Sequence, residues 1–208
     1  MKLRHLIGLS LFTTSLLAST NEASDDLLVQ LDIIKTLSGE FTQTLQDDLG
    51  DVIDTSQGDF TLEKPARIRW NIEMPLKQLI VSNATSLWIY DPDLEQVIID
   101  TVEPSSQITP IALFNGNNDD LGKHYQVSRV SNGMAEHTFL LLPNDDTSLF
   151  RRIEISFNKL GPVMLAITDS LDQITRIDFH NIAINESVDP ILFEFAIPAN
   201  TDIINNVQ

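Results

Sequence analysis

Residues 58–75 read GDFTLEKPARIRWNIEMP and contain the clearest strand pattern of the chain. Between residues 66 and 73 the side chains alternate in character with a period of two, which is typical of a strand with one dry and one wet face. The apolar face carries Ala66, Ile68, Trp70 and Ile72, and the polar face carries Arg67, Arg69, Asn71 and Glu73. Phe60 and Leu62 repeat the pattern just before, so this region predicts neighbouring strands that share one apolar side.

The same alternation recurs along the chain in short segments separated by Gly, Asn, Asp or Pro. Their connections are mostly short, which favours antiparallel pairing because a parallel crossover needs about a dozen residues or more. Eleven candidate strands cover roughly residues 41–48, 57–64, 66–73, 77–82, 86–91, 95–100, 124–130, 135–142, 151–157, 162–169 and 173–184.

Helical spacing is confined to two segments. Ser24 can cap a helix whose first turn carries two aspartates, and Gly39 ends its pattern. The apolar residues of this helix are Leu27, Leu28, Leu31, Ile34 and Leu37. Between residues 103 and 122, a short helix can begin at Pro110. We expect both segments to act as a lid.

So many strands and so little helix predict an α+β protein that is mainly β. A long apolar sheet side needs a cover, and two or three short helices cannot cover a flat sheet of this size. The pattern therefore favours a strongly curved sheet, a closed or nearly closed antiparallel barrel, with the helices over its open side.

The first residues have the features of a secretory signal peptide. Lys2 and Arg4 precede an apolar stretch from residue 6 to residue 18, and small and polar residues follow. This stretch is too short to span a bilayer as an anchor. We expect residues 1–23 to be removed by cleavage between residues 18 and 23, which leaves a single domain over residues 24–208 in the periplasm or outside the cell.

Composition excludes several classes of function. The chain of 208 residues has 30 acidic and 13 basic side chains, a net charge of −17 and no cysteine. A surface of this charge repels phosphate backbones, so we expect no nucleic-acid partner. Without cysteine there is no thiol catalysis, thiolate metal site or lipid attachment through sulfur. The four histidines form no metal-binding pattern, and nucleophile-elbow, phosphate-binding and dinucleotide motifs are missing, so we expect no enzyme, metal or cofactor.

Several motifs in this order resemble the LolA family of periplasmic outer-membrane lipoprotein carriers. They are GEFTQT at 39–44, GDFTLEKPARIRWNIEMP at 58–75, SLWIYDPDLEQV at 86–97, ITPIALFNG at 108–116 and FEFAIPANTDI at 193–203. The resemblance implies an unclosed, eleven-stranded antiparallel barrel with a helical lid. It also implies a monomer whose cavity takes up the acyl chains of lipoproteins released from the inner membrane by the LolCDE transporter and delivers them to the outer-membrane acceptor LolB. The alternative is a periplasmic lipid- or lipoprotein-binding sensor or carrier of the same fold with another ligand, as in RseB-like proteins.

The family resemblance, together with the alternation that places apolar side chains on one face of the strands, suggests that these side chains form the wall of a ligand-binding cavity. Its expected members are Leu31, Ile34, Leu37, Phe60, Leu62, Ile68, Trp70, Ile72, Ile111, Leu113 and Phe114. Lys64 is at the position where members of the family carry an arginine that latches the lid. Residues 60, 62 and 64 are two apart and so fall on the same face of a strand, which predicts that the side chain of Lys64 points inward like those of Phe60 and Leu62. We expect its ammonium group to bond the lid region at 103–122 or the end of the N-terminal helix; the alternative is a lysine that extends into water.

Overall fold

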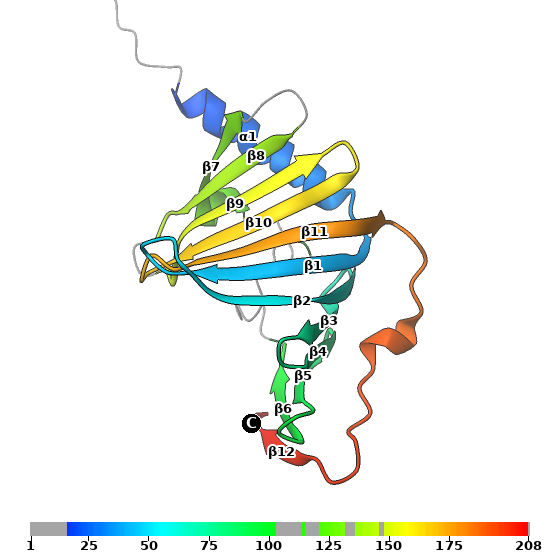
Figure 1. The fold of residues 1–208 in the computed structure, drawn as a ribbon. Helices are drawn as coiled ribbons and strands as arrows, with labels where there is room; N and C mark the ends of the chain where they lie inside the picture. Colours follow the sequence, from blue (N-terminus) through cyan, green and yellow to red (C-terminus); the bar gives the residue numbers. More distant parts are fainter. Residues whose placement is uncertain (1–15, 103–113, 115–120, 132–135, 146–147, 208) are drawn as a thin grey trace, which may run out of the picture.

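The computed structural model describes residues 16–102, 114, 121–131, 136–145 and 148–207. These residues build one twelve-stranded sheet in the order β12-β6-β5-β4-β3-β2-β1-β11-β10-β9-β8-β7. The sheet is strongly curved, and its edge strands β7 and β12 lie at opposite ends of the molecule (Figure 1). The barrel is therefore unclosed, and the predicted class, mainly β with few helices, is confirmed.

The strands are β1 (Thr36–Gln46), β2 (Val52–Glu63), β3 (Arg67–Met74), β4 (Gln78–Asn83), β5 (Ser86–Asp91), β6 (Gln96–Thr101), β7 (Tyr125–Ser131), β8 (His137–Pro143), β9 (Phe150–Asn158), β10 (Gly161–Asp169), β11 (Ile174–Ile184) and β12 (Asp202–Asn205). The helices are α1 (Leu16–Asp32), α3 (Leu121–His124) and the 3-10 helix η1 (Pro190–Phe193).

The predicted strands correspond to β1–β11, which pair antiparallel with their neighbours. The predicted count of eleven is wrong by one, because β12 adds a parallel strand beside β6. All residues of β12 are exposed, so the strand has no apolar face that alternation could reveal. Its place depends on pairing with a distant edge rather than on its own pattern.

The N-terminal helix differs from its predicted bounds at both ends. Helix α1 begins at Leu16, so Ser24 lies inside it and is not its cap, and it ends at Asp32. Leu37, which the helical spacing includes in the helix, belongs to β1. Its spacing after Ile34 fits a helix, but Leu37 pairs with Leu62 of β2, and this strand pairing overrides the local pattern.

Gly39 does not end the helix, because it lies inside β1 at an irregularity in the pairing with β11. A Cβ atom at this position would lie 2.8 Å from the carbonyl oxygen of His180. Glycine is therefore required here for close approach of two backbones.

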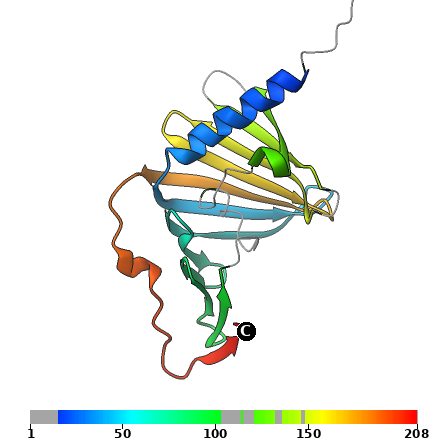
Figure 2. The same ribbon diagram turned by 180° about the vertical axis from the view of Figure 1, so that it is seen from behind.

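Helix α1 lies across the concave side of the sheet. Figure 2, the view from the side opposite to Figure 1, shows the helix in front of the strands. Apolar residues of α1 and of the concave face form one buried cluster that includes Leu27, Leu31, Ile155 and Leu165. The opposite face of β3–β5 is covered by the C-terminal segment, where Phe193 is buried and the ring of Phe195 lies 5.4 Å from that of Tyr90. The C-terminal segment therefore packs on the face of these strands that is turned away from the apolar interior.

An apolar interior beneath helix α1

The concave face brings most of the predicted wall residues together. Ile72 is half buried against the edge of the same cluster. Ile111 and Leu113 lie outside the described residues. The buried members of the predicted wall are Leu31, Ile34, Leu37, Phe60, Leu62, Ile68, Trp70 and Phe114.

Aromatic rings line one half of this interior. Phe60 and Trp70 are directly opposite each other on β2 and β3, with ring centroids 5.5 Å apart. Trp70 stacks on Phe41 of β1 at 3.8 Å, and Phe60 lies 5.4 Å from Phe179 of β11. Contacts of this kind bury large apolar areas without directional hydrogen bonds.

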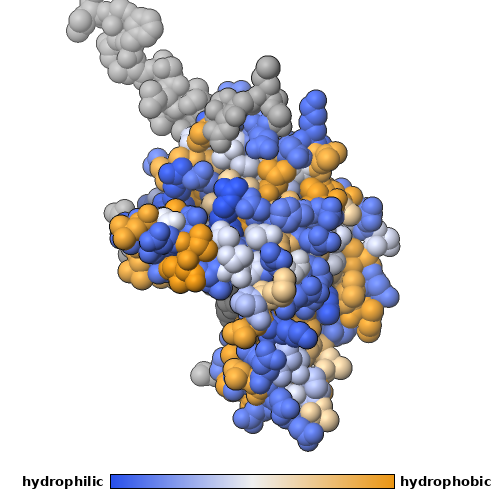
Figure 3. Space-filling view, in the orientation of Figure 1, coloured by the Kyte–Doolittle hydropathy of each residue, from blue (hydrophilic) through white to orange (hydrophobic). Residues whose placement is uncertain are grey.

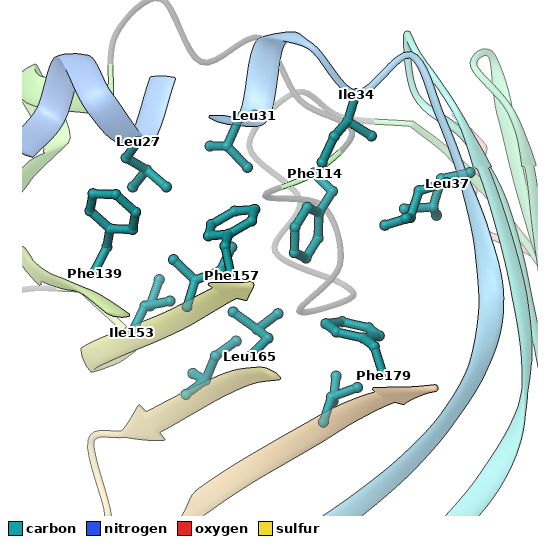
Figure 4. Close-up of a cluster of buried hydrophobic side chains, with 14 of the residues drawn as sticks. Leu27, Leu31, Ile34, Leu37, Phe114, Phe139, Ile153, Phe157, Leu165 and Phe179 are labelled. Carbon is teal, nitrogen blue, oxygen red and sulfur yellow. The ribbon is translucent and has the colours of Figure 1, made fainter. Parts of the chain in front are cut away.

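The other half of the wall was missed by the site prediction. It is formed by strands β8–β11, with Phe139, Ile153, Phe157, Leu165 and Phe179 pointing toward α1 (Figure 4). The signal that could have found these residues is their period-two alternation, which marks the apolar face of β9 and β10. The apolar interior therefore extends over nearly the whole width of the sheet.

Phe114 lies inside the half-barrel between α1 and the sheet (Figure 4). Its side chain is 1% exposed, and its ring contacts Phe157 and Phe179 edge-on at centroid distances of 6.4 and 5.7 Å. The ring fills space that would otherwise separate the helix from the strands.

Lys64 lies beside the C-terminal end of α1. Its Nζ donates a hydrogen bond of 2.8 Å to the carbonyl oxygen of Leu31 and lies 3.9 Å from Oδ1 of Asp32. The side chain is only 18% exposed, so it is turned to the helix end and not extended into water. Burial lowers the pKa of Lys64, an effect that Asp32 opposes and Lys35 reinforces.

Asn185 holds the same helix end and was not anticipated from sequence. Its Nδ2 donates to the carbonyl oxygen of Ile33 at 2.7 Å, and its Oδ1 accepts from the backbone N–H of Lys35 at 2.7 Å. Carbonyl groups at a helix end have no partner within the helix. Lys64 and Asn185 each donate to a carbonyl group at or just beyond the end of α1, and the carbonyl oxygen of Leu31 also accepts the backbone N–H of Ile34.

The helix is also tied on its other side, at the sheet edge formed by β7. The guanidinium group of Arg129 donates to the carboxylate of Asp26, and it also lies 5.5 Å from the ring centre of Phe139. Both charged side chains are nearly half exposed, and ion pairs of this kind contribute about 0–1 kcal/mol. Helix α1 is thus fastened by few polar contacts, one at the edge strand β7 and the others at its C-terminal end, beside the end of β2.

The buried polar side chains of the described residues are four hydroxyl groups, those of Ser56, Ser82, Thr138 and Ser156. No charged side chain is buried in this part of the chain, and no cluster of possible metal ligands occurs among the residues that were placed. None of the described helices is long and apolar enough to cross a membrane. The fold and its interior thus define a class of protein, in which a curved sheet forms a half-barrel with an apolar concave face and a helix lies over that face.

Comparison with known proteins identifies the family. The family described as outer membrane lipoprotein carrier protein LolA matches residues 32–196, and the chain belongs to this family. An outer-membrane lipoprotein carrier protein of Alcanivorax borkumensis is 34% identical over 187 residues, 90% of each chain. One of Francisella philomiragia is 36% identical over 190 residues, 89% of this chain and 90% of its own. The resemblance stated from the motifs is therefore confirmed.

Solved structures share the fold at low sequence identity. An uncharacterized conserved protein from Thermus thermophilus aligns with a TM-score of 0.54 at 11% identity, covering 88% of this chain and 99% of the other. The Pseudomonas aeruginosa MucA/MucB complex contains a chain that aligns with a TM-score of 0.52 at 13% identity, covering 84% of this chain and 61% of that one. These likenesses concern the fold alone.

Proposed function

We propose that this protein is a periplasmic carrier that binds the acyl chains of lipoproteins on its concave face. The observation that carries the proposal is the interior beneath α1, which is lined by apolar side chains and covered by a helix with few polar ties. Membership of the LolA family and the export signal expected at residues 1–23 support the same function. The function is carriage and not catalysis.

The energetics of acyl chains explain why such an interior is needed. Each buried methylene contributes about 0.8 kcal/mol, so long acyl chains do not cross an aqueous compartment uncovered. An apolar wall holds its cargo by contact area rather than by specific hydrogen bonds, which permits release to a second apolar site. Because side chains such as Phe114 fill the interior in this structure, entry of acyl chains requires α1 and Phe114 to move away from the sheet.

Lys64 is the proposed latch of this cover. It joins the end of β2 to the last turn of α1 through the carbonyl oxygen of Leu31, and that contact must break when the helix moves outward. A lysine brings one point charge where the family's arginine brings a planar group with five donors. We therefore expect a weaker latch here than an arginine would form.

The proposed partners follow from the family resemblance. The carrier receives lipoproteins from the inner-membrane transporter LolCDE and delivers them to the acceptor LolB at the outer membrane. Ile68, Trp70 and the other buried residues of the wall are proposed to contact the acyl chains directly. We also propose that the carrier acts as a monomer.

The test is to export the protein in a Gram-negative host, purify it from the periplasm and identify bound molecules by native mass spectrometry. Triacylated lipoproteins support the proposal, whereas a glycolipid or an unliganded protein contradicts it. Ile68→Glu should abolish uptake, because an unpaired carboxylate against acyl chains costs several kcal/mol. Arg69→Glu is the matched control, since residue 69 is on the opposite face of the same strand.

The comparison is made only between variants with native circular dichroism. If Ile68→Glu does not fold, Ile68→Ser replaces it, and uptake should then fall without being lost. Unchanged uptake by a folded Ile68→Glu protein would remove Ile68 from the wall.

A further inference from the structure

Exposed apolar side chains cap one end of the half-barrel, at the turns that join β1 to β2, β8 to β9 and β10 to β11. We call this surface the tip patch. Figure 3 shows apolar surface, in orange, at the left of the molecule, where Figure 1 places the β1–β2 and β10–β11 turns. The patch consists of Leu49, Val52, Ile53, Leu149 and Leu171, whose exposed fractions are 83, 57, 53, 66 and 71%.

The sheet topology brings these turns together. Gln46 at the end of β1 pairs with Val52 on one side and with Ile174 on the other, so the turns before β2 and before β11 are neighbours. The backbone N–H of Ser170 donates to the carbonyl oxygen of Leu149 at 3.1 Å. This hydrogen bond joins the β10–β11 turn to the residues just before β9. The patch is therefore one surface built from three separate parts of the chain.

Two of the leucines are held at the tips by the same local geometry. In the first turn, Oδ1 of Asp47 accepts the backbone N–H groups of Leu49 and Asp51 at 3.0 and 2.8 Å. In the β10–β11 turn, Oδ1 of Asp169 accepts the backbone N–H group of Leu171 at 2.8 Å. A side-chain acceptor that bonds the backbone two residues later orders a turn. Each leucine is thus presented on an ordered turn although the fold uses neither side chain for its core.

Exposed carboxylates lie beside this apolar centre on two of the turns, whereas Arg151 and Arg152 follow Leu149. Asp48, Asp51 and Asp54 are exposed on the β1–β2 hairpin, and the chain as a whole carries a net charge of −17. Asp172, next to Leu171, is also exposed and pairs with Arg151 at 2.7 Å. This charge opposes an anionic membrane and also a second copy of the same surface.

We propose that the tip patch docks a protein surface that has an apolar centre and a rim of lysine and arginine. Exposed apolar residues within a polar rim are typical of protein contacts. A patch of a few side chains is at the small end of specific interfaces, so the contact is transient. The site is separate from the interior beneath α1 and requires no movement of the helix.

The test measures binding of a helical peptide with a leucine face and lysines on its other positions. The matched probe has the same leucine face and glutamates in place of the lysines. The lysine peptide should bind the full-length protein, and binding should weaken at least tenfold in the triple variant Leu49→Ser, Leu149→Ser, Leu171→Ser. The control is Leu160→Ser, which alters a leucine that is 76% exposed on the β9–β10 turn at the opposite end of the strands.

Equal binding to the triple variant and the wild type would overturn the proposal, as would equal binding of the glutamate peptide. Flotation with phosphatidylglycerol vesicles that depends on the tip leucines would instead make the occupant a membrane. Self-association in sedimentation equilibrium that the triple variant loses would make it a second copy. Replacing Asp48, Asp51 and Asp54 with asparagine keeps the leucines and should weaken binding of the lysine peptide mainly at low salt. This variant separates the contribution of the charged rim to binding from that of the apolar centre.

Discussion

Phe114→Ala removes the aromatic ring that fills the centre of the half-barrel. The side chain is 1% exposed and makes edge-on contacts with Phe157 and Phe179, so its loss should lower the free energy of unfolding by about 3–5 kcal/mol. Domains of ordinary stability, about 5–15 kcal/mol, tolerate such a loss and stay folded.

The same substitution should strengthen binding of an acyl chain. In the wild type the ligand must displace the ring of Phe114, whereas in the variant its place is open. About four methylenes that fill this space contribute about 3 kcal/mol, and each 1.4 kcal/mol corresponds to roughly a tenfold change in the dissociation constant. We expect at least tenfold tighter binding of a fluorescent C16 fatty acid, and a smaller loss of stability when that ligand is present.

Urea unfolding followed by circular dichroism, with and without the fatty acid, measures both effects. Phe193→Ala is the matched control, because Phe193 is equally buried but lies outside the concave cluster. It should lose comparable stability without any gain in affinity. If Phe114→Ala binds the fatty acid no better than the wild type, or both variants change affinity equally, the assignment of the interior as the acyl site is refuted.

Two further predictions concern the latch and the sheet. Lys64→Leu removes the hydrogen bond to Leu31 and should slow transfer of a loaded lipoprotein to the acceptor more than it lowers the melting temperature, whereas Lys64→Arg should keep or improve transfer. The rate at which loaded variants transfer lipoprotein to the acceptor measures this effect. If Lys64→Leu transfers at the wild-type rate, Lys64 has no latch function. Gly58→Ala should destabilise the protein by about 3 kcal/mol in urea unfolding, because its Cβ would collide with the backbone of Asn71 at the β2–β3 irregularity. Gly122→Ala is the control; its Cβ would lie 3.4 Å from the nearest side-chain atom, and unchanged or improved stability is expected there.

The strands of this protein were predictable because alternation is a local property. A strand with one buried face carries its pattern within a few residues, as Ile68, Trp70 and Ile72 do on β3. The motifs around these residues also identified the family. Prediction failed where local spacing permits two structures: Leu37 fits the helical period, but pairing with Leu62 places it in a strand.

The contacts that hold the cover depend on the tertiary structure. Lys64 is 33 residues from Leu31 in the chain, and Arg129 is 103 residues from Asp26, so no local pattern relates them. The parity of Lys64 indicated that it points inward, but which carbonyl oxygen it meets depends on where α1 ends.

The tip patch shows the same division. Each of its leucines, read alone, is an ordinary residue in a polar turn. Only the order of strands in the sheet places Leu49, Leu149 and Leu171 on adjoining turns. Sequence periodicity determines which face of a strand is buried because side chains alternate along one backbone, whereas the neighbours of a turn are set by pairings between strands that lie far apart in the chain.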